Sequence, residues 1–169
     1  MILKQRRDLD GAMAKAKEAE QVCRQLGNRD GLQATLCEQA NILADRGDLD
    51  GAMTLYKEQE RMCRQLGNLD SLSIALGNQA LILDERGDLE GAMVLHKEKE
   101  RICRQLSTVK GLVEALANQA LVFREMRRAR EGLPLVEEAH RLATTHGYAA
   151  LARQIEPILN AVREAARGG

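Results

Sequence analysis

The sequence predicts an all-α fold, a solenoid of antiparallel helix pairs, on the basis of three observations. An eight-residue phrase, Arg46-Gly-Asp-Leu-Asp-Gly-Ala-Met53, returns 40 residues later as Arg86-Gly-Asp-Leu-Glu-Gly-Ala-Met93, and an altered version occupies 6–13. A second phrase, Cys-Arg-Gln-Leu, begins at residues 23, 63 and 103. Between these phrases, apolar residues are spaced by three and four, as on one face of an α-helix. Self-similarity at such a period indicates stacked repeats, each contacting only its neighbours.

The composition excludes several classes of function. Lys and Arg together number 25, as do Asp and Glu, so the positive charge expected of a nucleic-acid-binding protein is missing. Aromatic residues make up only 2% of the chain, which leaves almost nothing for stacking on bases. Residues 1–7 do not resemble a signal peptide, and no run approaches the roughly 20 apolar residues that span a bilayer. We therefore expect no nucleic-acid partner, no membrane association and a cytoplasmic location.

The four cysteines are expected to be reduced thiols that pack as small apolar groups. Cys23, Cys63 and Cys103 occupy the same place in successive repeats. Stacked helices lie about 8–10 Å apart, whereas a disulfide needs Cα atoms within about 7 Å. The cysteine spacing matches no zinc motif, and no phosphate-binding loop is present. The sequence therefore implies no metal and no cofactor.

The first helix of each repeat is marked by an apolar stripe spaced by four, four and three residues. In the middle repeat this stripe consists of Leu72, Leu76, Ala80 and Leu83. The same stripe recurs 40 residues earlier and 40 residues later. This pattern predicts first helices at 30–46, 70–86 and 110–127.

The second helix of each repeat follows an Arg-Gly-Asp turn. Gly47 and Gly87 can adopt the left-handed conformation that ends a helix, and Asp48 and Asp88 can cap the next one. The tripeptide therefore indicates a tight interhelical turn rather than an integrin-binding loop. We expect the small pair Gly51-Ala52 where two helices cross closely. Second helices are predicted at 49–66 and 89–106.

The C-terminal part of the chain departs from the repeat. From Arg127 onward the phrase decays, and Pro134 is expected in the first turn of a helix at 130–146, where a proline is tolerated. A last helix at 149–166 shares no phrase with the earlier ones. We interpret it as a terminal cap, followed by a frayed tail.

The chain also begins irregularly, because residues 2–8 align with 42–48, the end of a first helix. The sequence thus starts inside a repeat, either cut from a longer array or with a truncated front, and a helix is predicted at 8–26. That helix could pair with its copy in a homodimer. The predicted organisation is one solenoid, 1–169, with a partial repeat, three repeats of which the last is degenerate, and a capping helix: 1–28, 29–68, 69–108, 109–148 and 149–166.

These helix pairs resemble the tetratricopeptide repeat (TPR). The small residues that carry the resemblance are Ala40, Ala80 and Ala120 in the first helices and Ala12, Ala52 and Ala92 in the second. The usual TPR period is about 34 residues, so the chain is similar to the longer-helix class of kinesin light chain and bacterial signalling scaffolds. The resemblance implies a right-handed superhelix with a concave groove. The chain departs from the family pattern at Gln39, Gln79, Gln119, His96 and Lys99.

The resemblance also implies that the first helices line a groove holding an extended peptide or a partner helix. Asn78 and Asn118 match an asparagine that bonds the backbone of a bound peptide in the long-helix class, whereas Glu38 interrupts this series. A side-chain amide suits that task because it donates and accepts hydrogen bonds at once. The expected groove residues are Asn41, Asp45, Asn78, Leu81, Glu85, Asn118, Leu121, Arg124 and Glu125.

Several of these residues have a structural interpretation as well. Asn78 and Asn118 could simply bridge neighbouring helices. The glutamines at 39, 79 and 119 are expected to satisfy loop carbonyls between repeats. His96 stands alone at a core-facing position and is expected to be buried rather than catalytic. The one basic cluster is either a solvated turn or a contact for an acidic partner segment: Arg124, Arg127, Arg128 and Arg130.

No catalytic constellation occurs in the sequence, so an enzyme is not expected. The predicted function is a noncatalytic protein–protein interaction scaffold that binds a peptide or helix in the groove. Two alternatives remain. One is a structural self-assembly element forming a dimer or an array, and the other is the regulatory arm of a larger signalling protein.

Overall fold

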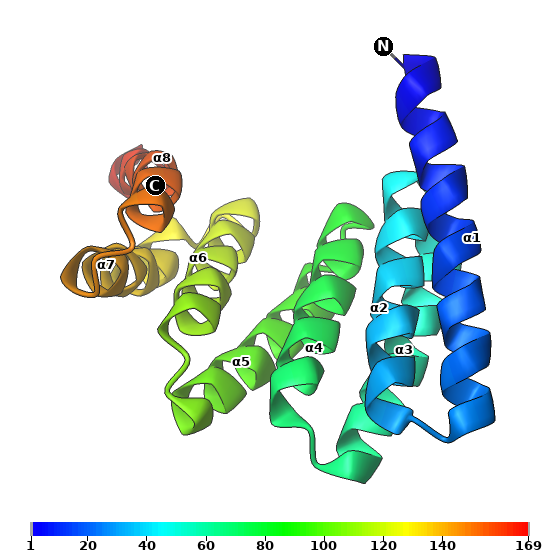
Figure 1. Cartoon of the computed structure of the whole chain (residues 1–169). Helices are drawn as coiled ribbons and strands as arrows, with labels where there is room; N and C mark the ends of the chain where they lie inside the picture. The colour runs from blue at the N-terminus through cyan, green and yellow to red at the C-terminus, as the bar shows by residue number, and fades with distance from the viewer. Residues whose placement is uncertain (1, 169) are drawn as a thin grey trace. The chain divides into compact units, whose positions relative to one another are not determined.

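The computed structural model describes the backbone of residues 2–168 and the side chains of residues 9–168. Within this range the chain forms eight α-helices and no strand (Figure 1). The helices are α1 (Ile2–Leu26), α2 (Arg29–Asp45), α3 (Leu49–Leu66), α4 (Leu69–Glu85), α5 (Leu89–Leu106), α6 (Val109–Glu125), α7 (Ala129–Thr145) and α8 (Ala149–Gly168). The all-α prediction is confirmed, and every predicted helix end but one lies within two residues of the observed end.

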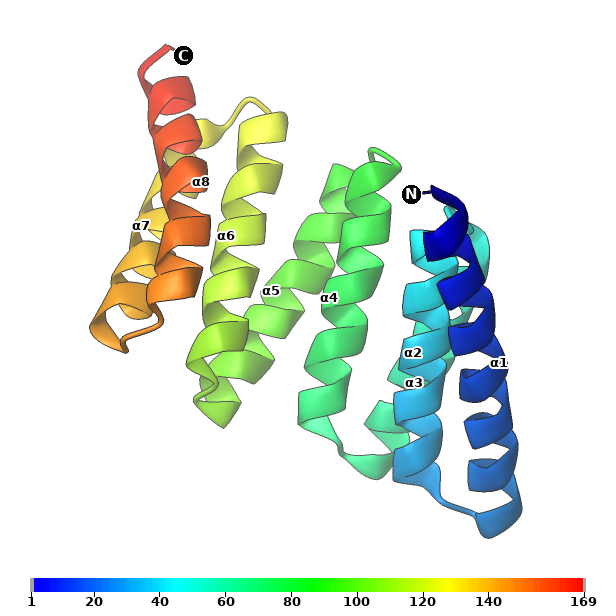
Figure 2. The same cartoon turned by 45° about the horizontal axis from the view of Figure 1, so that its top comes forward.

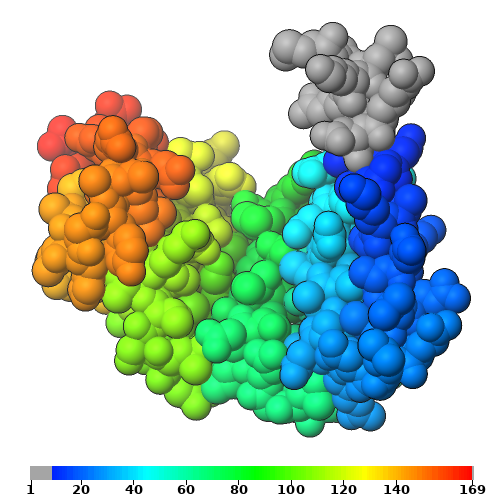
Figure 3. Space-filling view, in the orientation of Figure 1, coloured from blue at the N-terminus to red at the C-terminus, as the bar shows by residue number. Residues whose placement is uncertain are grey.

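The chain divides into two compact units, Met1–Ala75 and Leu76–Gly169, with the boundary inside α4. In unit 1, α2 packs against both α1 and α3. Figure 3 shows α1 and α2, in blue, packed side by side. Met13 and Ala16 of α1 are buried against Ile42 of α2. The N-terminal helix is therefore held to α2 by a small apolar cluster.

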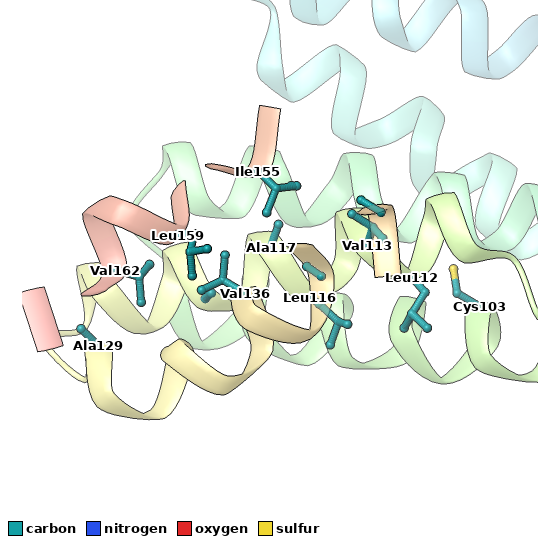
Figure 4. Packing of buried hydrophobic residues seen from close by; sticks show 13 residues of the cluster. Cys103, Leu112, Val113, Leu116, Ala117, Ala129, Val136, Ile155, Leu159 and Val162 are labelled. Atoms are coloured by element: carbon teal, nitrogen blue, oxygen red, sulfur yellow. The ribbon is translucent and has the colours of Figure 1, made fainter. Parts of the chain in front are cut away.

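The core of unit 2 joins four helices. α7 packs against both α6 and α8, and α6 also packs against α5 (Figure 2). Figure 4 shows the cluster of buried apolar side chains between them, which includes Val113 and Leu116 of α6, Val136 of α7, and Ile155 and Leu159 of α8. Burial of such side chains contributes roughly 1.5–3 kcal/mol each. This cluster therefore fixes α8 on the rest of unit 2.

The turns before α3 and α5 are built as the sequence predicts. Gly47 and Gly87 have φ angles of 81° and 77°, in the left-handed region. The carboxylates of Asp48 and Asp88 each accept a hydrogen bond of 2.9 Å from the backbone N–H three residues later. The two Arg-Gly-Asp tripeptides are therefore helix-terminating turns with a capping aspartate.

The glycines that follow these turns have a different role from the one predicted. A Cβ atom on Gly51 would lie 2.5 Å from Oδ2 of Asp48, so this glycine makes room for the capping carboxylate. A close helix crossing occurs at Gly132 of α7, the repeat position equivalent to Ala52 and Ala92. There a Cβ would lie 2.9 Å from the carbonyl oxygen of Ala120 and 3.0 Å from its Cα. Gly132 thus allows α7 to approach the backbone of α6.

Helix α1 is longer than predicted, because no turn separates residues 2–7 from the rest of the helix. Arg7 stands where the later repeats have Gly47 and Gly87. A left-handed conformation costs an L-residue roughly 1–2 kcal/mol, so the helical conformation is favoured at an arginine. The predicted start of this helix at residue 8 was therefore wrong. Of the predicted frayed tail, Gly168 belongs to α8 and Gly169 lies outside the described residues.

Pro134 also lies elsewhere than predicted. Because α7 begins at Ala129, Pro134 is inside the helix rather than in its first turn. A proline has no N–H, so the carbonyl of Arg130 lacks its usual intrahelical donor. Pro157 has the same effect in α8. Each of the two C-terminal helices therefore continues past a proline with one intrahelical backbone hydrogen bond fewer.

Candidate functional site

In unit 1 the predicted groove residues lie on the exposed face of α2. Asn41 and Asp45 are both exposed and stand one helical turn apart. The hydroxyl of Tyr56 in α3 donates a hydrogen bond to Oδ1 of Asn41. The amide nitrogen of Asn41 also lies 3.9 Å from the sulfur of Cys37. The amide of Asn41 is therefore held in place by its own chain.

Asp45 lies beside a cavity of about 360 Å³ in unit 1. The other residues described around this cavity are Leu9, Asp10 and Arg46. Arg46 forms an ion pair with Asp10 of α1. An exposed pair of this kind contributes little to stability, roughly 0–1 kcal/mol. Asp45 itself remains accessible.

In unit 2 the predicted residues of α6 form one accessible stripe. Asn118, Leu121 and Glu125 are spaced by three and four residues, which places them on one helix face. Asn118 and Leu121 are half-buried and Glu125 is exposed. Among the described residues the side chain of Asn118 has no hydrogen-bond partner. Its amide is therefore available to a ligand.

Helix α4 carries the matching residues Asn78, Leu81 and Glu85. Leu81 is 49% exposed, although it is a large apolar side chain. Asn78 is half-buried and already takes part in an interaction within the chain. The two asparagines that the sequence makes equivalent thus differ, and Asn118 is the one with an uncommitted amide.

The C-terminal ends of α4 and α6 are close in space. Burial raises the pKa of Asp84 in α4, and the charge of Glu125 in α6 raises it further. Oδ1 of Asp84 is buried without a hydrogen-bond partner. Arg124, beside Glu125, is half-buried and has no ion-pair partner within the described residues. This end of the stripe therefore carries the carboxyl groups of Asp84 and Glu125 close together, with Arg124 beside them.

Sequence reasoning missed a partly buried ion pair next to this stripe. Nζ of Lys99 in α5 lies 3.1 Å from Oε2 of Glu114, and the Lys99 side chain is only 10% exposed. Glu114 stands one helical turn before Asn118. A Cβ on Gly77 of α4 would lie 3.0 Å from Nζ of Lys99. Gly77 and Lys99 are the residues from which this contact could have been predicted. A glycine on one helix leaves space that the long side chain of a lysine on the next helix can fill.

His96 is buried one turn before Lys99, as the sequence predicts. The residue is 0% exposed, and neither ring nitrogen has a hydrogen-bond partner. Burial lowers the pKa of His96 to about 4, with a smaller contribution from the positive charge of Lys99. The imidazole is therefore neutral at pH 7 and is a core side chain.

Two of the glutamines that recur in the repeat, Gln39 and Gln119, bind carboxylates rather than the loop carbonyls that were predicted. The amide of Gln39 donates to Glu20 of α1 at 2.6 Å, and that of Gln119 donates to Glu100 of α5 at 2.7 Å. Each of these glutamates also binds an arginine four residues later in its own helix. The Gln39 hydrogen bond is the largest cause of the lowered pKa of Glu20. The glutamines therefore link helices of successive pairs, and their role is structural.

All four cysteines are free, and burial raises the pKa of Cys63 to about 11, so its thiol is unreactive at neutral pH. The described residues contain no group of three or more His, Cys, Asp or Glu side chains arranged to hold a metal ion. None of the helices in the described range combines the length and apolar character that crossing a membrane requires.

Comparisons with known proteins place the fold. Neither a protein-family model nor a curated protein matches the sequence. The crystal structure of BtubC (BKLC) from P. vanneervenii has a TM-score of 0.66 at 18% identity, over 92% of this chain and 74% of that one. A putative kinesin light chain of P. anserina with nearly identical TPR-like repeats has a TM-score of 0.62 at 14% identity, over 96% and 91%.

A de novo designed helical repeat protein is also similar, with a TM-score of 0.53 at 16% identity over 95% of this chain and 91% of that one. At such identities the similarity concerns the fold alone. It confirms the resemblance to long-helix TPRs that the repeated phrases indicate. Helical repeat folds generally serve as scaffolds or interaction modules. The chain is thus an all-α helical repeat protein with the fold of the TPR-like repeats of kinesin light chain.

Proposed function

We propose that the chain is a noncatalytic protein–protein interaction module whose unit 2 binds an extended peptide along the exposed stripe of α4 and α6. The observation that carries this proposal is the half-buried amide of Asn118, which has no hydrogen-bond partner among the described residues. A primary amide can donate to a peptide carbonyl and accept from a peptide N–H at once. Asn118 would therefore recognise backbone rather than a particular side chain.

The residues around Asn118 indicate which side chains a bound peptide should carry. Leu81 and Leu121 offer apolar surface on the two helices, and Leu81 is 49% exposed. The carboxylates of Glu85 and Glu125 lie further along the stripe and are exposed. The binding segment is therefore expected to carry apolar side chains and at least one basic side chain.

In unit 1, Asn41 and Asp45 would contribute a second binding surface of the same kind. The hydrogen bond from Tyr56 holds the amide of Asn41 before any ligand arrives. Preorganised groups lose less conformational entropy on binding. Each unit thus presents an asparagine followed by an acidic residue.

The test is a selection of peptides from a random library on the immobilised chain, followed by Kd measurements by fluorescence anisotropy. Asn118→Ala is expected to raise the Kd of the selected peptide about tenfold, because the two hydrogen bonds that are lost contribute about 1.4 kcal/mol or more. Asn160→Ala is the matched control, since Asn160 is exposed on α8. If the folded Asn118→Ala variant and the folded double variant with Asn78→Ala both bound the peptide with unchanged Kd, the stripe would not be the binding site.

Self-association through α1 is a second candidate function, and one observation favours it. Val22 and Leu26 stand one turn apart on α1 and are 47% and 75% exposed. Adjacent exposed apolar side chains are typical of interaction surfaces. By contrast, Ala16 is buried and Ala12 is partly buried, so a charge at either would disturb the contact with α2 instead of a dimer.

This candidate is tested by light-scattering mass over a wide concentration range. A dimer that dissociates in the double variant Val22→Glu, Leu26→Glu would support assembly through α1. Val94→Glu is the control, because Val94 is 64% exposed on α5. A wild-type chain that stays monomeric at every concentration would exclude assembly as a function of this chain.

A further inference from the structure

A second polar site lies in unit 2, between the start of α7 and the end of α8. A cavity of about 260 Å³ is lined by Arg127, Arg128, Ala129, Arg130, Glu131 and Ala165. We call it the arginine pocket. Its residues belong to the turn before α7 and to α7 and α8, whereas the proposed peptide stripe lies on α4 and α6. The arginine pocket is therefore a separate surface.

Within the described residues, two of the three guanidinium groups in the arginine pocket form no ion pair with a carboxylate. Arg128 forms two hydrogen bonds to Glu131, at 2.6 and 2.8 Å, and stacks 5.1 Å from the ring centre of Phe123. Nε of Arg130 donates to the carbonyl oxygen of Ala166 at 3.2 Å, which leaves its terminal nitrogens available. The side chain of Arg127 has no hydrogen bond or ion pair within the described residues.

The charge balance of the arginine pocket is positive. Glu131 neutralises Arg128, and the two are locked to each other. Two charges on α5 lie further away: Glu90 is near enough to raise the pKa of Arg128, and Lys97 is near enough to lower the pKa of Glu131. Because Glu90 is negative and Lys97 is positive, together they add no net charge. What remains is the charge of Arg127 and Arg130. Paired guanidinium groups match the two oxygens of a carboxylate.

The backbone at Arg127 is not one that an arginine favours. Its φ is 59°, and the equivalent residues Gly47 and Gly87 are glycines with φ of 81° and 77°. An L-residue in this region costs roughly 1–2 kcal/mol. A glycine at residue 127 would therefore stabilise this turn more than the arginine does. What the arginine adds is a cation at the mouth of the arginine pocket.

We propose that the arginine pocket binds a carboxylate of an acidic peptide segment on a partner protein, with Arg127 and Arg130 as the recognising groups. The fixed pair of Arg128 and Glu131 forms one wall, and Ala165 of α8 forms another. The chain has balanced charge and 2% aromatic residues, so an acidic peptide fits it better than a nucleic acid does. The site is independent of the peptide stripe on α4 and α6.

The test uses fluorescein-labelled decaglutamate as the probe, with decaglutamine as the uncharged reference, in fluorescence anisotropy at about 0.15 M ionic strength, where the Debye length is about 8 Å. The wild-type chain should bind decaglutamate and not decaglutamine. Arg127→Gly should weaken decaglutamate binding at least about tenfold, because a charge-assisted pair is lost. This variant restores the residue of the equivalent turns, so it should fold at least as stably as the wild type.

Two controls make the result decisive. Arg141→Ala removes an exposed arginine elsewhere on α7 and should change the Kd less than about twofold, since exposed charges distant from the site are screened. Asn118→Ala should leave decaglutamate binding unchanged, which separates this site from the peptide stripe. Equal weakening by Arg127→Gly and Arg141→Ala, or no binding by the wild type, would overturn the proposal. Inorganic phosphate displacing the probe at lower concentration than free glutamate would overturn the choice of a carboxylate.

Discussion

Helices α3 and α5 both begin within nearly the same eight-residue phrase, 46–53 and 86–93, yet their buried faces differ. At equivalent positions α3 has Tyr56 and α5 has His96. The tyrosine hydroxyl donates a hydrogen bond to Asn41, whereas both nitrogens of the histidine lack a partner. The residue equivalent to Asn41 is Leu81, which offers no polar group. The hydrogen bond between these two positions is thus present in unit 1, and its equivalent in unit 2 has no polar acceptor.

This comparison shows that the repeated phrase determines the backbone but not the interior. The glycine turn, the capping aspartate and the small residues suffice to place a helix. The side chains one and two turns further on can then vary, provided each is satisfied or remains uncharged. His96 meets this requirement by remaining neutral. As a consequence, the stability of the folded chain should decrease in acid.

The largest expected effect is therefore a pH dependence that originates in His96. Its pKa is about 4 in the folded chain and about 6.5 when exposed, so the unfolded chain binds the additional proton between these values. Its contribution to stability is complete above pH 6.5 and is lost as the pH falls towards 4. At about 1.4 kcal/mol for each pKa unit, the free energy of unfolding should fall by about 3 kcal/mol from pH 7 to pH 4.

The measurement is urea unfolding of the wild type and His96→Leu at several pH values between 4 and 7. The variant should lose most of this slope, because leucine does not titrate. Glu20 remains in both proteins, and its lowered pKa contributes stability that is lost in acid in either one. The same slope in both proteins would show that His96 is not the source.

The complete pair in unit 1 should behave differently. Tyr56→Phe removes the hydroxyl and leaves Oδ1 of Asn41 without its donor, which should cost about 1 kcal/mol. The cost should not depend on pH between 4 and 7, since tyrosine titrates near 10. Chemical unfolding measures both quantities.

A double-mutant cycle with Asn41→Leu, which introduces the residue of unit 2, isolates the pair. Tyr56→Phe should cost much less in the presence of Asn41→Leu than in its absence. An additive double variant would mean that the hydroxyl and the amide do not stabilise each other.

The fold could be predicted from the sequence because its determinants are local and repeated. Gly47 and Asp48 act within a few residues of their position, and the same residues recur 40 positions later. The resemblance to TPRs also pointed to Asn118, which proved accessible and unpartnered among the described residues. The resemblance alone could not distinguish it from Asn78, because that difference depends on neighbours in space.

Other parts of the site depend on contacts between helices, which spacing does not reveal. The pair of Lys99 and Glu114 joins α5 to α6, and it exists because Gly77 leaves room for the lysine stem. Gln119 binds Glu100 across the same two helices. The arginine pocket, similarly, needs the end of α8 to return to the start of α7.

The smallest expected effect concerns the ends of the same two helices. Helix α3 ends at Gly67 with a φ of 68°, and α5 ends at Ser107 with a φ of 56°. Serine in the left-handed region is strained, so Ser107→Gly should raise the free energy of unfolding by about 0.5–1 kcal/mol, and Gly67→Ser should lower it by a similar amount. For a chain of this size that is a change in Tm of roughly 1–4 °C in each direction, which calorimetry resolves. If Ser107→Gly destabilised the chain instead, the serine side chain would have to contribute more at that turn than the left-handed backbone costs, and the two helix ends would not be equivalent.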